Sequence, residues 1–246
     1  MADQPCGDDC AAYDKISPAL DRFQEAHFWI HKPEEHYHDA DLFRWHLNVF
    51  LKAIKEVPQL VVMALQNEPG FSAWFKPLRL QLSSDPLMAE LSTNRDFVVH
   101  RGMLKLGSSG SVGITELRGM KLGIGMPIDP LEDSEVAMDR YVYHAAKEGD
   151  FFQFLMDDED SIPCVERTWK IPSLDGELLD VCTTAWKQTS SLLNEVIVWL
   201  QASPIPWTLS CRHNSNRVKF KLFKRTELQK KVRALRAEHG WNPSAN

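Results

Sequence analysis

A long amphipathic pattern over residues 41–66 constrains the fold of this chain more than any other feature. Its apolar positions step by four or three residues: Phe43, Leu47, Phe50, Ile54, Val57 and Val61. At 3.6 residues per turn these side chains form one continuous stripe on a helix. A helix with such a stripe needs other helices to cover it, so the pattern predicts a helical bundle. Pro58 is expected to kink this helix.

Similar periodicity predicts helices from Ser17 to about Ile30, from Phe71 towards Leu82, and over 87–100, 135–148, 175–202 and 226–239. The Lys32–Pro33 pair is expected to end the first of them. Residues 102–125 differ, because they hold seven of the twelve glycines among alternating apolar residues. This pattern of glycines and alternating apolar residues predicts a hairpin of two short strands. A strand over 165–171 is expected to join the hairpin. Residues 207–213 and 217–223 are expected to form a second hairpin.

These elements predict a mainly α protein, a helical bundle with a small β insertion and a β-hairpin-plus-helix C-terminal extension. The expected boundaries are a mobile acidic tail over 1–16, a helical domain over 17–203 with its glycine-rich insertion near 102–126, and a basic extension over 204–246. No apolar run approaches the length of a membrane span, and the N-terminus is polar. A cytoplasmic protein with no membrane association is therefore expected.

The net charge of −6 conceals a marked asymmetry along the chain. From residue 217 to the end the charge is +7, whereas the preceding residues carry −13. A basic end on an acidic body is typical of proteins that contact nucleic acid. The candidate RNA contacts are Arg217, Lys219, Lys221, Lys224 and Arg225. Alternatively, these side chains pair with the acidic body.

The helix predicted over 87–100 carries the most promising chemistry. Asp85 and Pro86 form a helix-start signal before it. Asp96 and His100 lie one turn apart on the face opposite the apolar stripe, and Arg95 lies to one side. A histidine can exchange protons near neutral pH, and a guanidinium can stabilise anionic charge on phosphate. Arg95, Asp96 and His100 are therefore the candidate catalytic residues, with Asp96 fixing the imidazole.

The segment Arg95-Asp-Phe-Val-Val-His100 resembles the motif of the HEPN superfamily, in which an arginine and a polar residue precede a histidine on one helix. The preceding long helix, Phe71 with Trp74, and Asp85-Pro86-Leu87 are also similar to the lead-in of bacterial members. This resemblance implies a dimeric, metal-independent endoribonuclease in which His100 transfers protons, Arg95 stabilises phosphate charge and Asp96 orients them. It further implies a homodimer, RNA as substrate and a possible antitoxin-like partner.

Other interpretations of the same residues stay open. Arg95 lies towards the apolar side of its helix, so it could be a buried, salt-bridged arginine, and an Asp–His pair at this spacing is a common surface contact. The chain could accordingly be a non-catalytic interaction or scaffold module, with the motif residues holding a dimer together. A nucleotide-binding accessory protein would use Arg95 without proton transfer.

No metal site and no cofactor are predicted. His27 and His31 are one helical turn apart, a spacing that can hold a transition metal. However, the glutamate expected between zinc-binding histidines is missing, and the helix is expected to end at Lys32–Pro33. We therefore expect His27 and His31 to be polar histidines beside a loop rather than metal ligands. The five cysteines show no paired zinc-ligand spacing.

Overall fold

The computed structural model describes residues 9–100, 102–116, 119–148, 161–207 and 218–241, except for the side chains of Phe97, Val99 and His100. The chain forms two compact units, each assembled from three segments. Unit 1 contains residues 1–35, 44–105 and 172–213, and unit 2 contains residues 36–43, 106–171 and 214–246. The fold is mainly helical with one small antiparallel sheet, as the sequence predicts.

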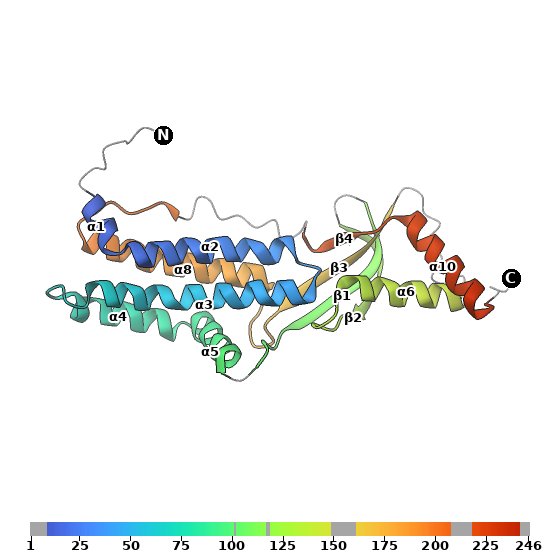
Figure 1. Ribbon diagram of the computed structural model, residues 1–246, viewed down its shortest axis with the longest axis horizontal. Helices are drawn as coiled ribbons and strands as arrows, with labels where there is room; N and C mark the ends of the chain where they lie inside the picture. Colours follow the sequence, from blue (N-terminus) through green and yellow to red (C-terminus); the bar gives the residue numbers. More distant parts are fainter. Residues whose placement is uncertain (1–8, 101, 117–118, 149–160, 208–217, 242–246) are drawn as a thin grey trace, which may run out of the picture. The chain divides into compact units, whose positions relative to one another are not determined.

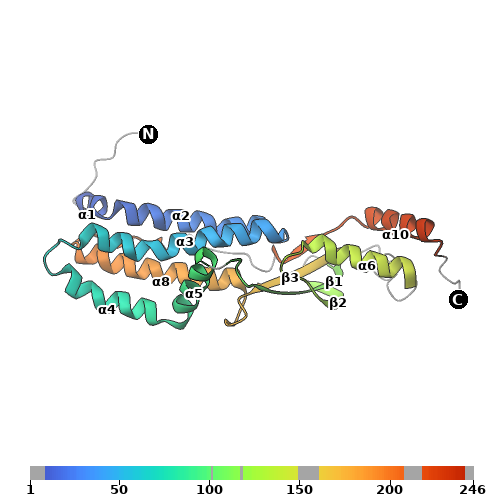
Figure 2. The ribbon, with the colours of Figure 1, turned by 60° about the horizontal axis from the view of Figure 1, so that its bottom comes forward.

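Unit 1 is a bundle of helices whose bounds follow the predicted periodicity closely. It contains α1 (Cys10–Lys15), α2 (Ser17–Glu35), most of α3 (Ala40–Leu65), α4 (Phe71–Ser84), α5 (Pro86–His100) and α8 (Leu178–Trp199). Helices α2, α3, α4 and α8 run alongside one another, whereas α5 turns away from their direction (Figures 1 and 2). Among the helices described here, none is long and apolar enough to cross a bilayer.

The apolar stripe of α3 is confirmed as a core-forming face. All six residues of the predicted stripe are at most 2% exposed. The helix continues through Pro58 to Leu65. From α8, Trp186 is also buried and stacks on Phe23 of α2, with ring centroids 4.6 Å apart. Burial of these large side chains supplies the main stabilisation of the bundle.

The predicted end of the first helix is wrong. Helix α2 continues through Pro33 to Glu35, and Pro33 is itself buried. A proline near the end of a helix removes one hydrogen bond but does not prevent the final turn from packing. His27 and His31 consequently lie on regular helix rather than at the start of a loop.

Unit 2 is built on a four-stranded antiparallel sheet with strand order β2-β1-β3-β4. The strands are β1 (Gly107–Thr115), β2 (Met120–Pro127), β3 (Ile162–Lys170) and β4 (Phe220–Leu222). The predicted glycine-rich hairpin is confirmed as β1 and β2, and the predicted strand that joins it is β3. Strand β4 pairs with β3. Most of its expected hairpin partner over 207–213 lies outside the described residues.

Two glycines of β1 are required by the close approach of neighbouring strands. A Cβ atom at Gly110 would lie 2.1 Å from the Glu166 carbonyl oxygen of β3. At Gly113 it would lie 2.1 Å from the Leu122 carbonyl oxygen of β2. No side chain fits at such distances, so these glycines are packing residues of the central strand.

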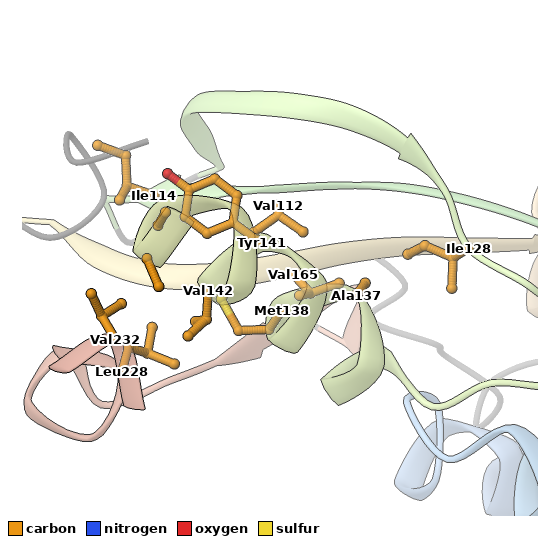
Figure 3. Packing of buried hydrophobic residues seen from close by; sticks show 12 residues of the cluster. Val112, Ile114, Ile128, Ala137, Met138, Tyr141, Val142, Val165, Leu228 and Val232 are labelled. Carbon is orange, nitrogen blue, oxygen red and sulfur yellow. The ribbon is translucent and has the colours of Figure 1, made fainter. Parts of the chain in front are cut away.

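Helices α6 (Ser134–Glu148) and α10 (Arg225–His239) belong to unit 2 and share its hydrophobic core with the sheet. Met138 and Val142 of α6 lie near Val165 of β3, whereas Tyr141 lies towards Val112 and Ile114 of β1, as Figure 3 shows. The α10 contribution comes from Leu228 and Val232. The final basic helix is thus held by an apolar stripe of its own.

A buried arginine lies on β3, two residues after Val165 of this apolar cluster. Arg167 of β3 is fully buried, and its guanidinium donates to Ser108 Oγ (2.9 Å), the Glu132 carbonyl (2.7 Å) and the Asp129 carbonyl (3.1 Å). It also lies 3.7 Å from the ring centroid of Trp169. These contacts connect β1, β3 and the loop before α6.

His38, between α2 and α3, gives unit 2 a predicted dependence on pH. Its Nε2 donates to the Val218 carbonyl (2.9 Å), and its Nδ1 accepts from Ser134 Oγ (2.8 Å), an arrangement of the neutral ring. Burial lowers the pKa of His38 to about 4. An unfolded histidine titrates near 6.5. Between these values the unfolded chain binds a proton that the folded chain does not.

Stability should therefore fall as the pH falls from about 6.5 towards 4. We expect His38 to contribute up to about 2 kcal/mol of the loss between pH 7 and pH 5. Urea unfolding at both pH values, for the wild type and His38→Gln, measures this contribution. An equal loss in the variant would show that His38 does not carry it.

Candidate functional site

Helix α5, which carries the predicted catalytic residues, begins where the sequence indicates. Asp85 Oδ1 accepts from the backbone N–H groups of Leu87 (3.0 Å) and Met88 (3.1 Å), so Asp85 satisfies two donors of the first turn. The predicted helix start is thus confirmed. Asp85 Oδ2 also accepts from Gln188 of α8 (3.1 Å), which ties the start of α5 to the bundle.

Asp96 lies at the centre of a three-residue charged cluster. Its Oδ1 accepts from Arg95 Nη1 (2.9 Å) and from Lys55 Nζ of α3 (2.5 Å). The Lys55 and Arg95 side chains are about one quarter exposed, whereas the Asp96 side chain is 48% exposed. The cluster Lys55–Arg95–Asp96 therefore joins α3 to α5 and carries a net charge of +1.

The protonation state of Asp96 follows from these contacts. The hydrogen bond from Lys55, supported by the one from Arg95, lowers the pKa of the Asp96 carboxyl. Asp96 is therefore a carboxylate at neutral pH, and it can orient cationic groups but cannot act as a general acid. Arg95 has one further donor of interest, because its buried Nε has no hydrogen-bond partner among the described residues.

His100 is the last residue of α5, one helical turn after Asp96. Its side chain lies outside the described residues, so its predicted approach to Asp96 stays a prediction. The structure brings two of the three predicted catalytic residues into direct contact. It also adds Lys55, which sequence reasoning missed because a residue 41 positions earlier meets Asp96 only through helix packing.

A pocket with a cavity of about 220 Å³ opens beside this cluster, where α3, α4 and α5 meet. Its apolar lining consists of Leu51, Ile54, Pro58, Leu82, Met88 and Leu91. Lys55 and Arg79 are the charged residues of the wall. Arg79 is exposed and forms no ion pair with any described residue. The pocket thus combines an apolar floor with positive charge at its edge, and no carboxylate belongs to its lining.

Three of the five predicted RNA contacts have side chains that contact acidic or carbonyl groups of unit 2, namely Lys221, Lys224 and Arg225. Lys221 pairs with Glu135 of α6, and Lys224 Nζ lies 3.3 Å from Glu227 Oε1. Arg225 donates to the Ser161 carbonyl, and the Lys219 carbonyl accepts from the backbone N–H of Arg167. Arg217 lies outside the described residues. Pairing with acidic side chains is the alternative that the sequence left open, and RNA contact by these residues stays a prediction.

Within the described residues, no group of three or more histidine, cysteine, aspartate or glutamate side chains is arranged to hold a metal ion. Cys164 and Cys182 are buried free thiols, and burial raises the pKa of each well above the range of a reactive thiolate. Neither cysteine therefore suits nucleophilic chemistry. The charged cluster and its pocket remain the strongest candidate site.

The geometry defines a mainly helical protein whose bundle presents a positively charged pocket and whose second unit combines a small antiparallel sheet with helices α6 and α10. A model of the family described as bacteriophage lambda protein ea47 matches residues 16–198, and the chain belongs to this family. The match includes all the residues of the charged cluster and ends before β4 and α10. No curated protein and no solved structure matches the chain.

Proposed function

We propose that unit 1 is a HEPN-like bundle that binds RNA at the Lys55–Arg95–Asp96 cluster and cleaves it without a metal ion. The observation that carries this proposal is the convergence of two cationic side chains from different helices on one carboxylate, beside a pocket without acidic lining. The sequence resemblance supplies the reaction class and the role of His100.

The charge balance of the cluster suits a phosphodiester. Asp96 neutralises only one of its two cationic neighbours, and Arg95 donates to it through one nitrogen, Nη1. The remaining N–H groups on the terminal nitrogens of the Arg95 guanidinium can donate to phosphate oxygens. The Lys55 ammonium provides a second positive charge next to the place where the phosphate would bind. Electrostatic stabilisation of the pentavalent transition state is the largest contribution such a site can make.

Proton transfer is assigned to His100. At the end of α5 it follows Asp96 by four residues, so its backbone lies one turn from the cluster. In this mechanism the imidazole removes the proton of the ribose 2′-hydroxyl, and the 2′-oxygen attacks phosphorus. The bond from phosphorus to the 5′-oxygen breaks, the 5′-oxygen takes a proton from the imidazolium, and a 2′,3′-cyclic phosphate is formed. Asp96 is ionised and can hold the histidine in its productive orientation.

The pocket provides a place for the base of the bound nucleotide. Its apolar floor buries a planar ring, and Arg79 at the edge can contact a neighbouring phosphate. Association of two copies through α5, implied by the HEPN resemblance, would place two such clusters side by side. Homodimer formation and an antitoxin-like partner are parts of the proposal.

One observation favours a second candidate, nucleotide binding without cleavage. The 2.5 Å contact between Lys55 and Asp96 connects α3 to α5, two helices that line the pocket. The cluster therefore also stabilises the wall of a pocket that is large enough for a base. In that case Arg79 and Lys55 would bind the phosphate groups of a free nucleotide, and His100 would have no chemical role.

The test is cleavage of mixed RNA in the presence of EDTA by the wild type and His100→Ala. We expect cleavage with 2′,3′-cyclic phosphate ends in the wild type and a loss of at least about 100-fold in the variant. Circular dichroism controls for folding. Equal cleavage by both proteins would overturn the assignment of His100, and no cleavage by the wild type would overturn the ribonuclease proposal.

Binding is measured in parallel with fluorescent RNA and with ATP. Lys55→Gln should weaken binding about fivefold to tenfold, while the charge-matched control Lys52→Gln, an exposed neighbour on α3, should not. Arg79→Gln is compared with Lys76→Gln on α4 in the same way. Tight ATP binding that depends on Arg79, without RNA cleavage, would select the second candidate.

A further inference from the structure

Two histidines of α2 bring their ring nitrogens together outside the candidate site. His27 Nε2 and His31 Nε2 are 3.4 Å apart, with the rings at 82° to each other. The two residues are separated by one helical turn, on a helix that continues to Glu35. Their backbone positions are therefore fixed by regular hydrogen bonding rather than by a loop.

The orientation of His31 is set by a carboxylate. Its Nδ1 lies 3.4 Å from Glu34 Oε2, at i+3 on the same helix. A carboxylate accepts, so Nδ1 carries the proton and Nε2 presents a lone pair towards His27. This carboxylate–histidine arrangement is the one that commonly supports metal-ligating imidazoles, because it fixes the tautomer and raises the basicity of the ligand nitrogen.

The orientation of His27 is set by packing. Its ring centroid lies 4.9 Å from that of Trp186, a buried residue of α8. His31 is 31% exposed at its side chain, so the space between the two nitrogens is within reach of solvent. One ring is thus held by the core and the other by a carboxylate, which reduces the entropy lost when both nitrogens bind one ligand.

The distance between the two Nε2 atoms equals the distance expected between two nitrogens that bind the same metal ion. Two metal–nitrogen bonds of about 2.0–2.1 Å at a tetrahedral angle place their nitrogens about 3.4 Å apart. We propose that His27 and His31 form a two-ligand site for a divalent transition metal ion, with water completing the coordination. Imidazole suits Zn²⁺, Cu²⁺ and Ni²⁺, and not Mg²⁺ or Ca²⁺.

This proposal does not depend on the proposed function. The histidine pair belongs to α2, whereas the candidate site is built from α3, α4 and α5. Cleavage of RNA is expected to survive EDTA, so a metal ion bound here would serve the fold or a partner rather than that reaction. Failure of either proposal leaves the other intact.

The experiment is calorimetric titration of the EDTA-stripped full chain with ZnCl₂ and with CuCl₂ at pH 7.5. We expect a site whose affinity falls at least tenfold in His31→Gln and in His27→Gln. His144→Gln is the matched control, because His144 lies 3.3 Å from Glu148 on α6 but has no histidine one turn away. Its affinity should equal that of the wild type.

Two further measurements distinguish metal coordination by the histidines from an indirect effect of the substitutions on folding. Affinity should fall as the pH is lowered, because protons compete with the metal ion for the ligand nitrogens. Copper bound by the wild type should show nitrogen hyperfine coupling by electron paramagnetic resonance, and this coupling should be reduced in His31→Gln, where a polar side chain replaces the half-buried imidazole. Absence of binding, or equal affinity and equal spectra in the wild type and both variants, would overturn the proposal.

Discussion

Replacing Arg167 with methionine is expected to lower the free energy of unfolding by about 3 kcal/mol. The methionine fills most of the arginine volume but donates no hydrogen bond. The Glu132 and Asp129 carbonyls, which accept from the guanidinium at 2.7 and 3.1 Å, would lose a charged donor in a buried place. Each such loss costs about 1–3 kcal/mol, and relief of guanidinium burial offsets part of it.

The aromatic neighbours of Arg167 would also be affected. The guanidinium lies over the Trp169 ring, which stacks on Phe43 with centroids 4.4 Å apart. Trp169 Nε1 donates to the Tyr37 carbonyl (2.8 Å), so the same ring anchors the segment before α3. Burial lowers the pKa of Arg167 to about 10, and the group therefore remains charged at neutral pH.

The measurement is chemical unfolding followed by far-ultraviolet circular dichroism. Arg140→Met is the matched control, because Arg140 is about half exposed and pairs with the Glu132 side chain at 2.6 Å. An exposed pair of this kind contributes about 0–1 kcal/mol. If both variants were destabilised equally, or neither were, Arg167 would not have the anchoring role described above.

The second large effect is expected in unit 1. Trp186→Ala should lower the free energy of unfolding by about 3–5 kcal/mol, as large-to-small changes of buried aromatic residues do. The side chain is 2% exposed, stacks on Phe23, and supports the His27 ring. Its removal leaves a cavity between α2 and α8 that the bundle cannot fill without moving one of these helices.

Trp186→Phe provides the control for this prediction. The indole Nε1 is buried and has no hydrogen-bond partner among the described residues, so its removal relieves a desolvation cost. Phenylalanine keeps a stacking ring, and we expect a loss of only about 1 kcal/mol. Thermal and urea unfolding measure both variants. A phenylalanine variant as unstable as the alanine variant would show that the exact indole shape, rather than ring burial, stabilises the bundle.

Helices and strands were predictable because each depends on a local repeat. The stripe from Phe43 to Val61 specifies a helix by its period, and the alternation around Val165 and Trp169 specifies a strand. Asp85 signals its helix start through its own side chain. The end of α2 was predicted wrongly because burial of Pro33, a property of the packed bundle, outweighed the local preference of proline.

The candidate site could be predicted only in part. Arg95 and Asp96 are neighbours in sequence, and their charge and position on one helix were sufficient to select them. Lys55 and Arg79 belong to other helices and look like ordinary surface residues in the sequence. Similarly, Arg167 reads as one polar residue in an alternating strand, and only its three acceptors explain its burial.

The sequence by itself determined the helical class, the glycine-rich hairpin and the helix with the arginine–aspartate pair, because these follow from the spacing of neighbouring residues. Only the tertiary structure decided which distant side chains meet: Lys55 with Asp96, and His27 with Trp186. The reason is physical. Local periodicity specifies which face of an element is apolar, whereas the partner of a charged or polar group depends on how those faces pack.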